Sequence, residues 1–191
     1  MRKWIAALVG LALAGVALFL VLRKPYPSDT TPEGAYARIA ESIARENDIG
    51  VFPYLEDDAQ WAAHSIRDAR KKALERIDQD YPADQRDVLR NAYAPVANAK
   101  DGAEVFVLYA RAKGWLVRLR KDLSGVASVD VDGDRATLVT SRQSRYTFRR
   151  RNNGIWGLVL FTSELVAEKE RTARDLEVVS HAADDYRANK K

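Results

Sequence analysis

The chain has no cysteine and very little of two other residues that carry site chemistry: its 191 residues include two His and one Met. The lack of cysteine excludes disulfides, thiolate metal ligands, a cysteine nucleophile and a cysteine-linked lipid tail. The two histidines, His64 and His181, are predicted on separate helices, and neither has a second histidine at metal-binding spacing. We therefore expect no metal site and no cofactor.

A charge excess of either sign is also missing once the N-terminus is set aside. The chain carries 31 Lys and Arg and 27 Asp and Glu. Arg2, Lys3, Arg23 and Lys24 flank a hydrophobic run, which leaves 27 bases against 27 acids for the rest. A formally neutral domain has no overall attraction to phosphate, so we expect no nucleic-acid partner.

What the sequence does contain is one long hydrophobic run. From Trp4 to Leu22, nineteen residues pass without a charged residue, Asn, Gln, Ser or Thr. At about 1.5 Å per helical residue, this run nearly spans the ~30 Å hydrocarbon core of a bilayer. We predict a single-pass transmembrane signal-anchor over residues 1–24, with the lipid bilayer as its partner. The bases before Trp4 favour a cytoplasmic N-terminus, which places the remainder in the periplasm or outside the cell.

A cleavable signal peptide is the alternative, with Ala12-Leu13-Ala14 resembling its cleavage site. Cleavage there would leave the apolar stretch Val16–Leu22 at the new N-terminus. The hydrophobic run is also longer than the hydrophobic region of a signal peptide, which is usually about 7–15 residues. The uncleaved anchor is therefore favoured. Ala6, Gly10 and Ala14 form a small-residue stripe on which a second transmembrane helix can pack, so a homo-oligomer stays open.

Beyond the anchor, the pattern predicts a Pro-rich linker at 25–30 and one α+β domain at 31–191. Apolar residues at helical spacing predict helices over about 31–47, 57–81, 83–95 and 101–119, with a long helix from 163 to 189. Alternation predicts four strands, over 126–131, 135–141, 145–151 and 155–161, joined by tight turns at Gly133 and Gly154. The fold class is thus several helices packed on a four-stranded antiparallel meander, ending in a long C-terminal helix.

The C-terminal helix carries one apolar stripe, formed by Thr172, Leu176, Val179, Ala183 and Tyr186. We expect this stripe to cover the sheet. A coiled-coil partner is the alternative, although two heptads are few for a coiled coil.

Several short stretches resemble the nuclear transport factor two-like domains, over about residues 31–161. They are Thr31–Tyr36, the apolar segment Val51–Leu55, Val131–Leu138, Tyr146–Phe148 and Gly154–Trp156. The resemblance implies a cone-shaped α+β domain around an apolar pocket, for which Tyr36, Phe52, Trp61 and Trp156 are the candidate lining residues. Members of that superfamily include isomerases, dehydratases and non-catalytic binding modules. The many helices before the strands and the long final helix depart from the family's pattern.

Candidates for catalysis are few. His64, with Asp58 nearby in sequence, is the best acid–base candidate for such a pocket, although a partly exposed structural histidine is the commoner case. The run Asp130–Asp134 superficially resembles a calcium loop, but strand pattern resumes at once, so a hairpin turn is expected.

Charge is distributed unevenly along the domain. Residues 111–151 carry eleven bases and four acids, whereas residues 25–110 carry ten bases and sixteen acids. The basic surface predicted from this excess consists of Arg142, Arg145, Arg149, Arg150 and Arg151. In one hypothesis, its partner is anionic lipid or an acidic protein surface. In the other, the alternation of side chains along the strands places these arginines in solvent, and some of them pair with acidic helices.

These observations favour a membrane-anchored, extracytoplasmic, non-catalytic interaction or ligand-binding domain. A pocket enzyme of isomerase or dehydratase type is the alternative, and an oligomerising structural membrane subunit is the third hypothesis.

Overall fold

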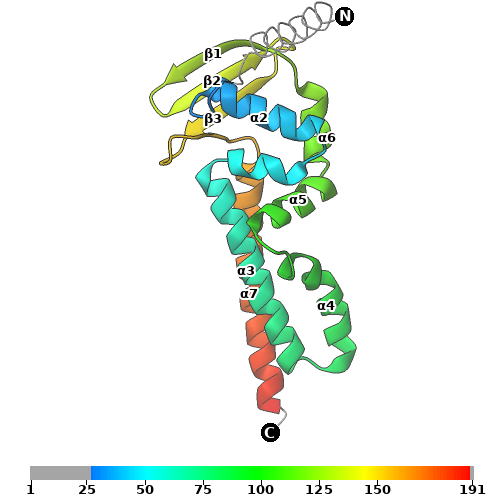
Figure 1. Cartoon of the computed structure of the whole chain (residues 1–191). Coiled ribbons are helices and arrows are strands. Elements are labelled where there is room, and N and C mark those ends of the chain that lie inside the picture. Colours follow the sequence, from blue (N-terminus) through cyan, green and yellow to red (C-terminus); the bar gives the residue numbers. More distant parts are fainter. Residues whose placement is uncertain (1–26, 190–191) are drawn as a thin grey trace, which may run out of the picture.

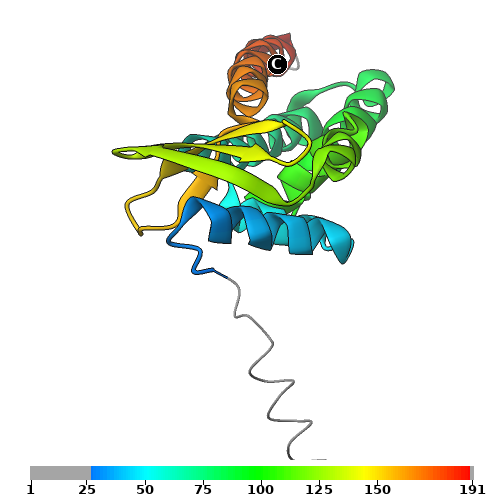
Figure 2. The ribbon, with the colours of Figure 1, turned by 90° about the horizontal axis from the view of Figure 1, so that it is seen from above.

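The computed structural model describes residues 27–189, and the predicted anchor lies outside them. Within 27–189, no helix is both long and apolar enough to cross a bilayer. The elements form two parts: a helix-covered sheet at one end, and a stalk of long helices that extends away from it (Figure 1). The first described residues and the C-terminal end lie at opposite ends of the molecule (Figures 1 and 2).

The sheet is an antiparallel meander in the order β1-β2-β3-β4, as predicted. Its strands are β1 (Val126–Asp132), β2 (Arg135–Thr140), β3 (Arg145–Arg150) and β4 (Trp156–Leu158). The positive φ of Gly133 (57°) and Gly154 (82°) confirms the two tight-turn glycines. The fourth strand is shorter than predicted, because the chain leaves the ladder after Leu158.

One face of the sheet is buried and the other is open. Ala136 pairs with Phe148 and Leu138 with Tyr146, and all four side chains are buried. Directly paired residues share a face, so Arg135 and its cross-strand partner Arg149 stand on the open face. The predicted alternation is confirmed here.

Helix α2 (Pro32–Ala44) packs on the sheet. Thr31 caps it by accepting a hydrogen bond from the Gly34 amide at 3.1 Å, and Pro32 occupies its first turn. Tyr36, Ile39 and Ile43 are buried at helical spacing.

Four further elements complete the main core. The 3₁₀ helix η1 (Asp48–Tyr54) buries Val51 and Phe52, which confirms the apolar segment. Helices α5 (Gly102–Ala112) and α6 (Trp115–Asp122) are separated at Gly114, which adopts a left-handed conformation with φ 65°. The single helix predicted over 101–119 is therefore two helices. Helix α3 (Asp57–Asp80) adds Ala59, Ala62, Ala63 and Ile66 to the core.

The stalk consists of α3, α4 (Ala83–Ala97) and α7 (Thr162–Asn189). Two ion pairs join α3 to α7: Arg70 with Asp175, and Asp80 with Arg187. The later residue of α3 pairs with the later residue of α7, so these two helices run parallel. A second, smaller core lies between the three helices, formed by Ala73, Ile77, Tyr81, Val179 and Ala183.

The stalk corrects one prediction. The stripe of α7 that begins at Thr172 packs on α3 and α4 rather than on the sheet, since Val179 and Ala183 belong to the second core. The partner of this stripe is thus within the same chain. Helix α4 also continues to Ala97, past the predicted stop near Pro95.

Candidate functional site

The predicted basic surface divides into two groups in the structure. Arg149 and Arg151 lie beside the start of α3, whereas Arg142 and Arg145 flank the β2–β3 turn next to α6. The side chain of Arg150 is exposed and makes no hydrogen bond or ion pair with the residues described. The five arginines therefore do not form one surface.

The first group is structural. The Arg151 guanidinium donates to Asp57 Oδ1 at 2.6 Å and to the Pro53 carbonyl at 2.8 Å, which ties η1 to the first turn of α3. Arg149 lies 3.3 Å from the carboxylate of Glu56, which is buried. The hypothesis that some of these arginines pair with acidic helices is confirmed for this group.

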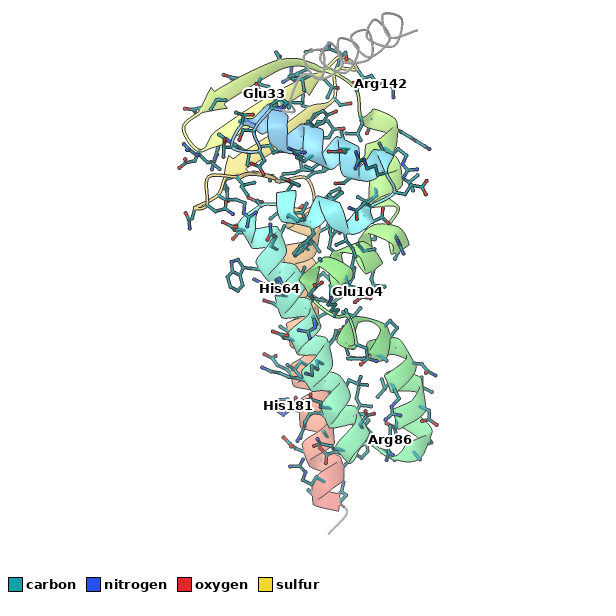
Figure 3. All side chains as sticks on the ribbon, in the orientation of Figure 1. Glu33, His64, Arg86, Glu104, Arg142 and His181 are labelled. Atoms are coloured by element: carbon teal, nitrogen blue, oxygen red, sulfur yellow. The ribbon has the colours of Figure 1, made fainter. Side chains whose placement is uncertain are left out.

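The second group joins bases that the sequence analysis did not single out. Arg142 donates through its guanidinium to the Lys121 carbonyl and through its amide to Ser124 Oγ at 3.2 Å. Arg120, one position earlier on α6, donates to the Ile43 carbonyl at 3.0 Å. We call Arg120, Lys121 and Arg142 the α6 basic patch. Figure 3 shows Arg142 at the sheet end of the molecule, far from His181 on the stalk.

The α6 basic patch adjoins an apolar groove between α2 and the start of β1. The groove has a volume of about 530 Å³; its apolar walls include Pro27, Ala37, Ala40 and Val126, and Glu33 and Glu41 also line it. Ser124 belongs to the groove and also bonds Arg142, so the two features are continuous. This surface lies at the point where the described chain begins.

A second hollow, which we call the α6 pocket, lies on the other side of α6 and has a volume of about 330 Å³. One face of α6 supplies Trp115, Arg118, Leu119 and Asp122, at the spacing of successive helical turns. The remaining walls come from the β2–β3 turn and strand β3 (Ser144, Arg145, Tyr146) and from the start of α7 with the residues before it (Leu160, Phe161, Glu164).

The hydroxyl of Tyr146 is unusual. It is buried in the wall of the α6 pocket, and no group in residues 27–189 makes a hydrogen bond of ordinary geometry with it. Burial raises the pKa of Tyr146 to about 12, the nearby Tyr36 phenol and Asp122 carboxylate act in the same direction, and the nearby Ser144 side chain opposes them. This hydroxyl therefore stays protonated and available as a donor near neutral pH.

The pocket candidates from the family resemblance do not meet in one cavity. Tyr36, Phe52 and Trp156 are buried in the main core, whereas Trp61 is 71% exposed on α3. Tyr36 donates to the Ser124 carbonyl and Trp156 Nε1 to the Thr30 carbonyl, so both polar groups serve the fold. Three of the four residues are core residues, and the fourth lies on the surface.

His64 and Asp58 also lie apart. The His64 ring packs on Gly102, where an added Cβ would lie 2.9 Å from it, and its edge meets Phe52 at 5.8 Å between ring centroids. The Asp58 side chain is 65% exposed and lies 3.6 Å from Arg149. These contacts give His64 a packing role, and they do not direct the two groups to a common substrate. Within residues 27–189, no cluster of His, Asp and Glu has the form of a metal site.

The chain is thus an α+β domain with a helical stalk, whose sheet end carries a basic patch, an apolar groove and a pocket lined by charges. No family model, curated protein or solved structure matches it. Its function has to be argued from these surfaces.

Proposed function

We propose that this protein is a membrane-anchored, extracytoplasmic, non-catalytic interaction domain whose α6 basic patch contacts anionic lipid headgroups. The observation that carries the proposal is the position of Arg120, Lys121 and Arg142 beside a groove that Pro27 lines. Arg120 forms an ion pair with Glu46 at 3.5 Å. No acidic side chain in residues 27–189 forms an ion pair with Lys121 or Arg142, so the charge of these two residues is available to a partner.

The length of the connection supports the membrane as that partner. Four residues lie between Leu22, the end of the hydrophobic run, and Pro27. At about 3.3–3.6 Å per extended residue, the five steps from Leu22 to Pro27 reach at most about 18 Å. If Trp4–Leu22 crosses the bilayer, the groove and the α6 basic patch are held close to the headgroups. Each base near an anionic surface contributes about 1 kcal/mol.

The domain spanning residues 25–191 tests this contact with vesicles of neutral lipid, with and without phosphatidylglycerol. We expect binding to anionic vesicles at low salt that weakens toward 0.15 M, because the Debye length is only ~8 Å there. The double change Lys121→Gln and Arg142→Gln should weaken binding about tenfold or more, from two lost contributions of about 1 kcal/mol each.

The matched control is Lys71→Gln with Lys72→Gln, which removes two exposed charges from the stalk. These lie about 20 Å along α3 from its sheet end, beyond the reach of a surface potential at physiological salt. Equal losses in both double variants, or a wild type that ignores anionic vesicles at low salt, would refute the lipid contact.

Topology is tested separately with the full chain. A reporter active only outside the cytoplasm, fused after Lys191, should be active, and the protein should resist carbonate extraction. A soluble product lacking the first residues would instead establish the cleavable signal peptide.

A further inference from the structure

The α6 pocket has a composition that the proposed lipid contact does not use. Four ionisable side chains line it, two of each sign: Arg118, Asp122, Arg145 and Glu164. None forms an ion pair within the described part of the chain, and the one hydrogen bond that any of the four side chains makes there is from Ser163 to Glu164. Unpaired charges of opposite sign around one small hollow are free to bind both ends of a dipolar molecule.

The floor of the pocket is apolar. The Trp115 and Phe161 rings stack at 5.1 Å between centroids with 15° between their planes, and both residues are buried. Leu160, at the same pocket, is 46% exposed. An apolar group that enters the pocket therefore meets aromatic and aliphatic surface.

We infer that the α6 pocket binds a small zwitterion of amino-acid type, with its carboxylate near Arg118 and Arg145, its ammonium near Asp122 and Glu164, and its apolar side chain on the Trp115–Phe161 floor. A molecule with one charge satisfies one pair and is repelled by the other, which selects against simple anions and cations. The pocket volume of about 330 Å³ suits a ligand of this size.

The inference does not depend on the lipid contact, since the residues that carry it are not those of the α6 basic patch. It is tested with the full chain in neutral-lipid nanodiscs. The probes are L-phenylalanine and L-leucine, with 3-phenylpropionate and 2-phenylethylamine as matched compounds that each lack one charge. Ligand-observed NMR and calorimetry report binding.

We expect L-phenylalanine or L-leucine to bind saturably, and each single-charge compound to bind at least about tenfold more weakly than L-phenylalanine, because a lost charge-assisted hydrogen bond has about that effect. Arg145→Gln and Glu164→Gln should each weaken zwitterion binding by about the same factor. Arg150→Gln and Glu170→Gln are the matched controls, since both residues are exposed and unpaired in the described chain, and they should leave the dissociation constant unchanged.

Three outcomes would overturn the inference. One is no saturable binding of either amino acid up to about 10 mM, a free energy weaker than about −3 kcal/mol. Another is equal affinity for the single-charge compounds. The third is unchanged affinity in Arg145→Gln and Glu164→Gln proteins whose melting temperatures match the wild type.

Discussion

The hydroxyl of Tyr109 on α5 donates a hydrogen bond of 2.6 Å to Glu168 on α7, and this contact joins the sheet end to the long C-terminal helix. Glu168 is buried, and Arg171 also bonds its carboxylate at 2.6 Å. Burial raises the pKa of Glu168, but the hydrogen bonds from Tyr109 and Arg171 outweigh it, so the pKa lies below its usual value. Burial, together with the same hydrogen bond, raises the pKa of Tyr109.

This pair predicts how stability depends on pH. A carboxylate whose pKa is lower in the folded state stabilises the fold above its unfolded pKa, about 4.3, and loses that contribution as pH falls through the folded pKa. Between about pH 5 and pH 2, Glu168→Gln should therefore show a shallower loss of stability than the wild type, measured by urea unfolding. Glu170→Gln, an exposed neighbour on α7, is the control. The wild-type slope in Glu168→Gln would contradict the role of this carboxylate.

Gly157 predicts a second effect, on backbone packing. A Cβ at this position would lie 2.5 Å from Glu56 Cα, where β4 meets the residues before α3. Gly157→Ala should lower the free energy of unfolding by about 2–4 kcal/mol, because backbone atoms cannot give way as a flexible side chain can. Gly125→Ala is the control, since its Cβ would meet only Ser141 Oγ at 3.4 Å. Equal unfolding midpoints for the two variants would refute the close approach.

Arg151 and Arg150 are adjacent in sequence but differ in partners, so they form a matched pair. Arg151→Ala should lower the free energy of unfolding by about 2–4 kcal/mol, since it leaves Asp57 and the Pro53 carbonyl without their shared donor. Arg150→Ala should stay within about 0.5 kcal/mol of the wild type. Thermal and urea unfolding measure both. A small effect at Arg151 would show that its contacts are solvent-screened.

Trp115 and Trp61 make the fourth comparison. Trp115 is buried against Phe161, whereas Trp61 is 71% exposed. Trp115→Ala should cost about 3–5 kcal/mol through the cavity that it leaves. Trp61→Ala should cost less than about 0.5 kcal/mol, as exposed substitutions do. A large loss at Trp61 would mean that its ring is covered in the native protein, by a partner or by part of the chain outside residues 27–189.

Local patterns predicted most of the elements, because the physics that sets them is local. Thr31-Pro32 specifies a helix start, and Gly133 and Gly154 specify turns that need positive φ. The alternation through Tyr146 and Phe148 correctly predicted the buried face of β3. None of these inferences requires knowledge of distant parts of the chain.

The partners of these elements were harder to predict. The apolar stripe on α7 shows that the helix buries one side. The spacing of its apolar residues alone does not tell whether the sheet or α3 and α4 pack against that side. Alternation likewise predicts that Arg142 and Arg149 are on the surface, but it does not predict their partners. Arg142 bonds the Lys121 carbonyl, and Arg149 pairs with Glu56. The α6 pocket joins segments about twenty residues apart along the chain, and the spacing of Trp115, Arg118 and Asp122 on one helical face was its one local signal.

The parallel course of α3 and α7 sets a distance as well as a contact. Twenty-eight residues of α7 at about 1.5 Å each reach about 42 Å from the sheet end to the tip near Asn189. Near this tip, Arg187 on α7 donates a hydrogen bond of 2.9 Å to the carboxylate of Asp80 on α3. This contact limits how far the two helices can separate at their C-terminal ends. A molecule bound at the tip and one bound at the α6 basic patch would therefore be separated by a distance of about that size.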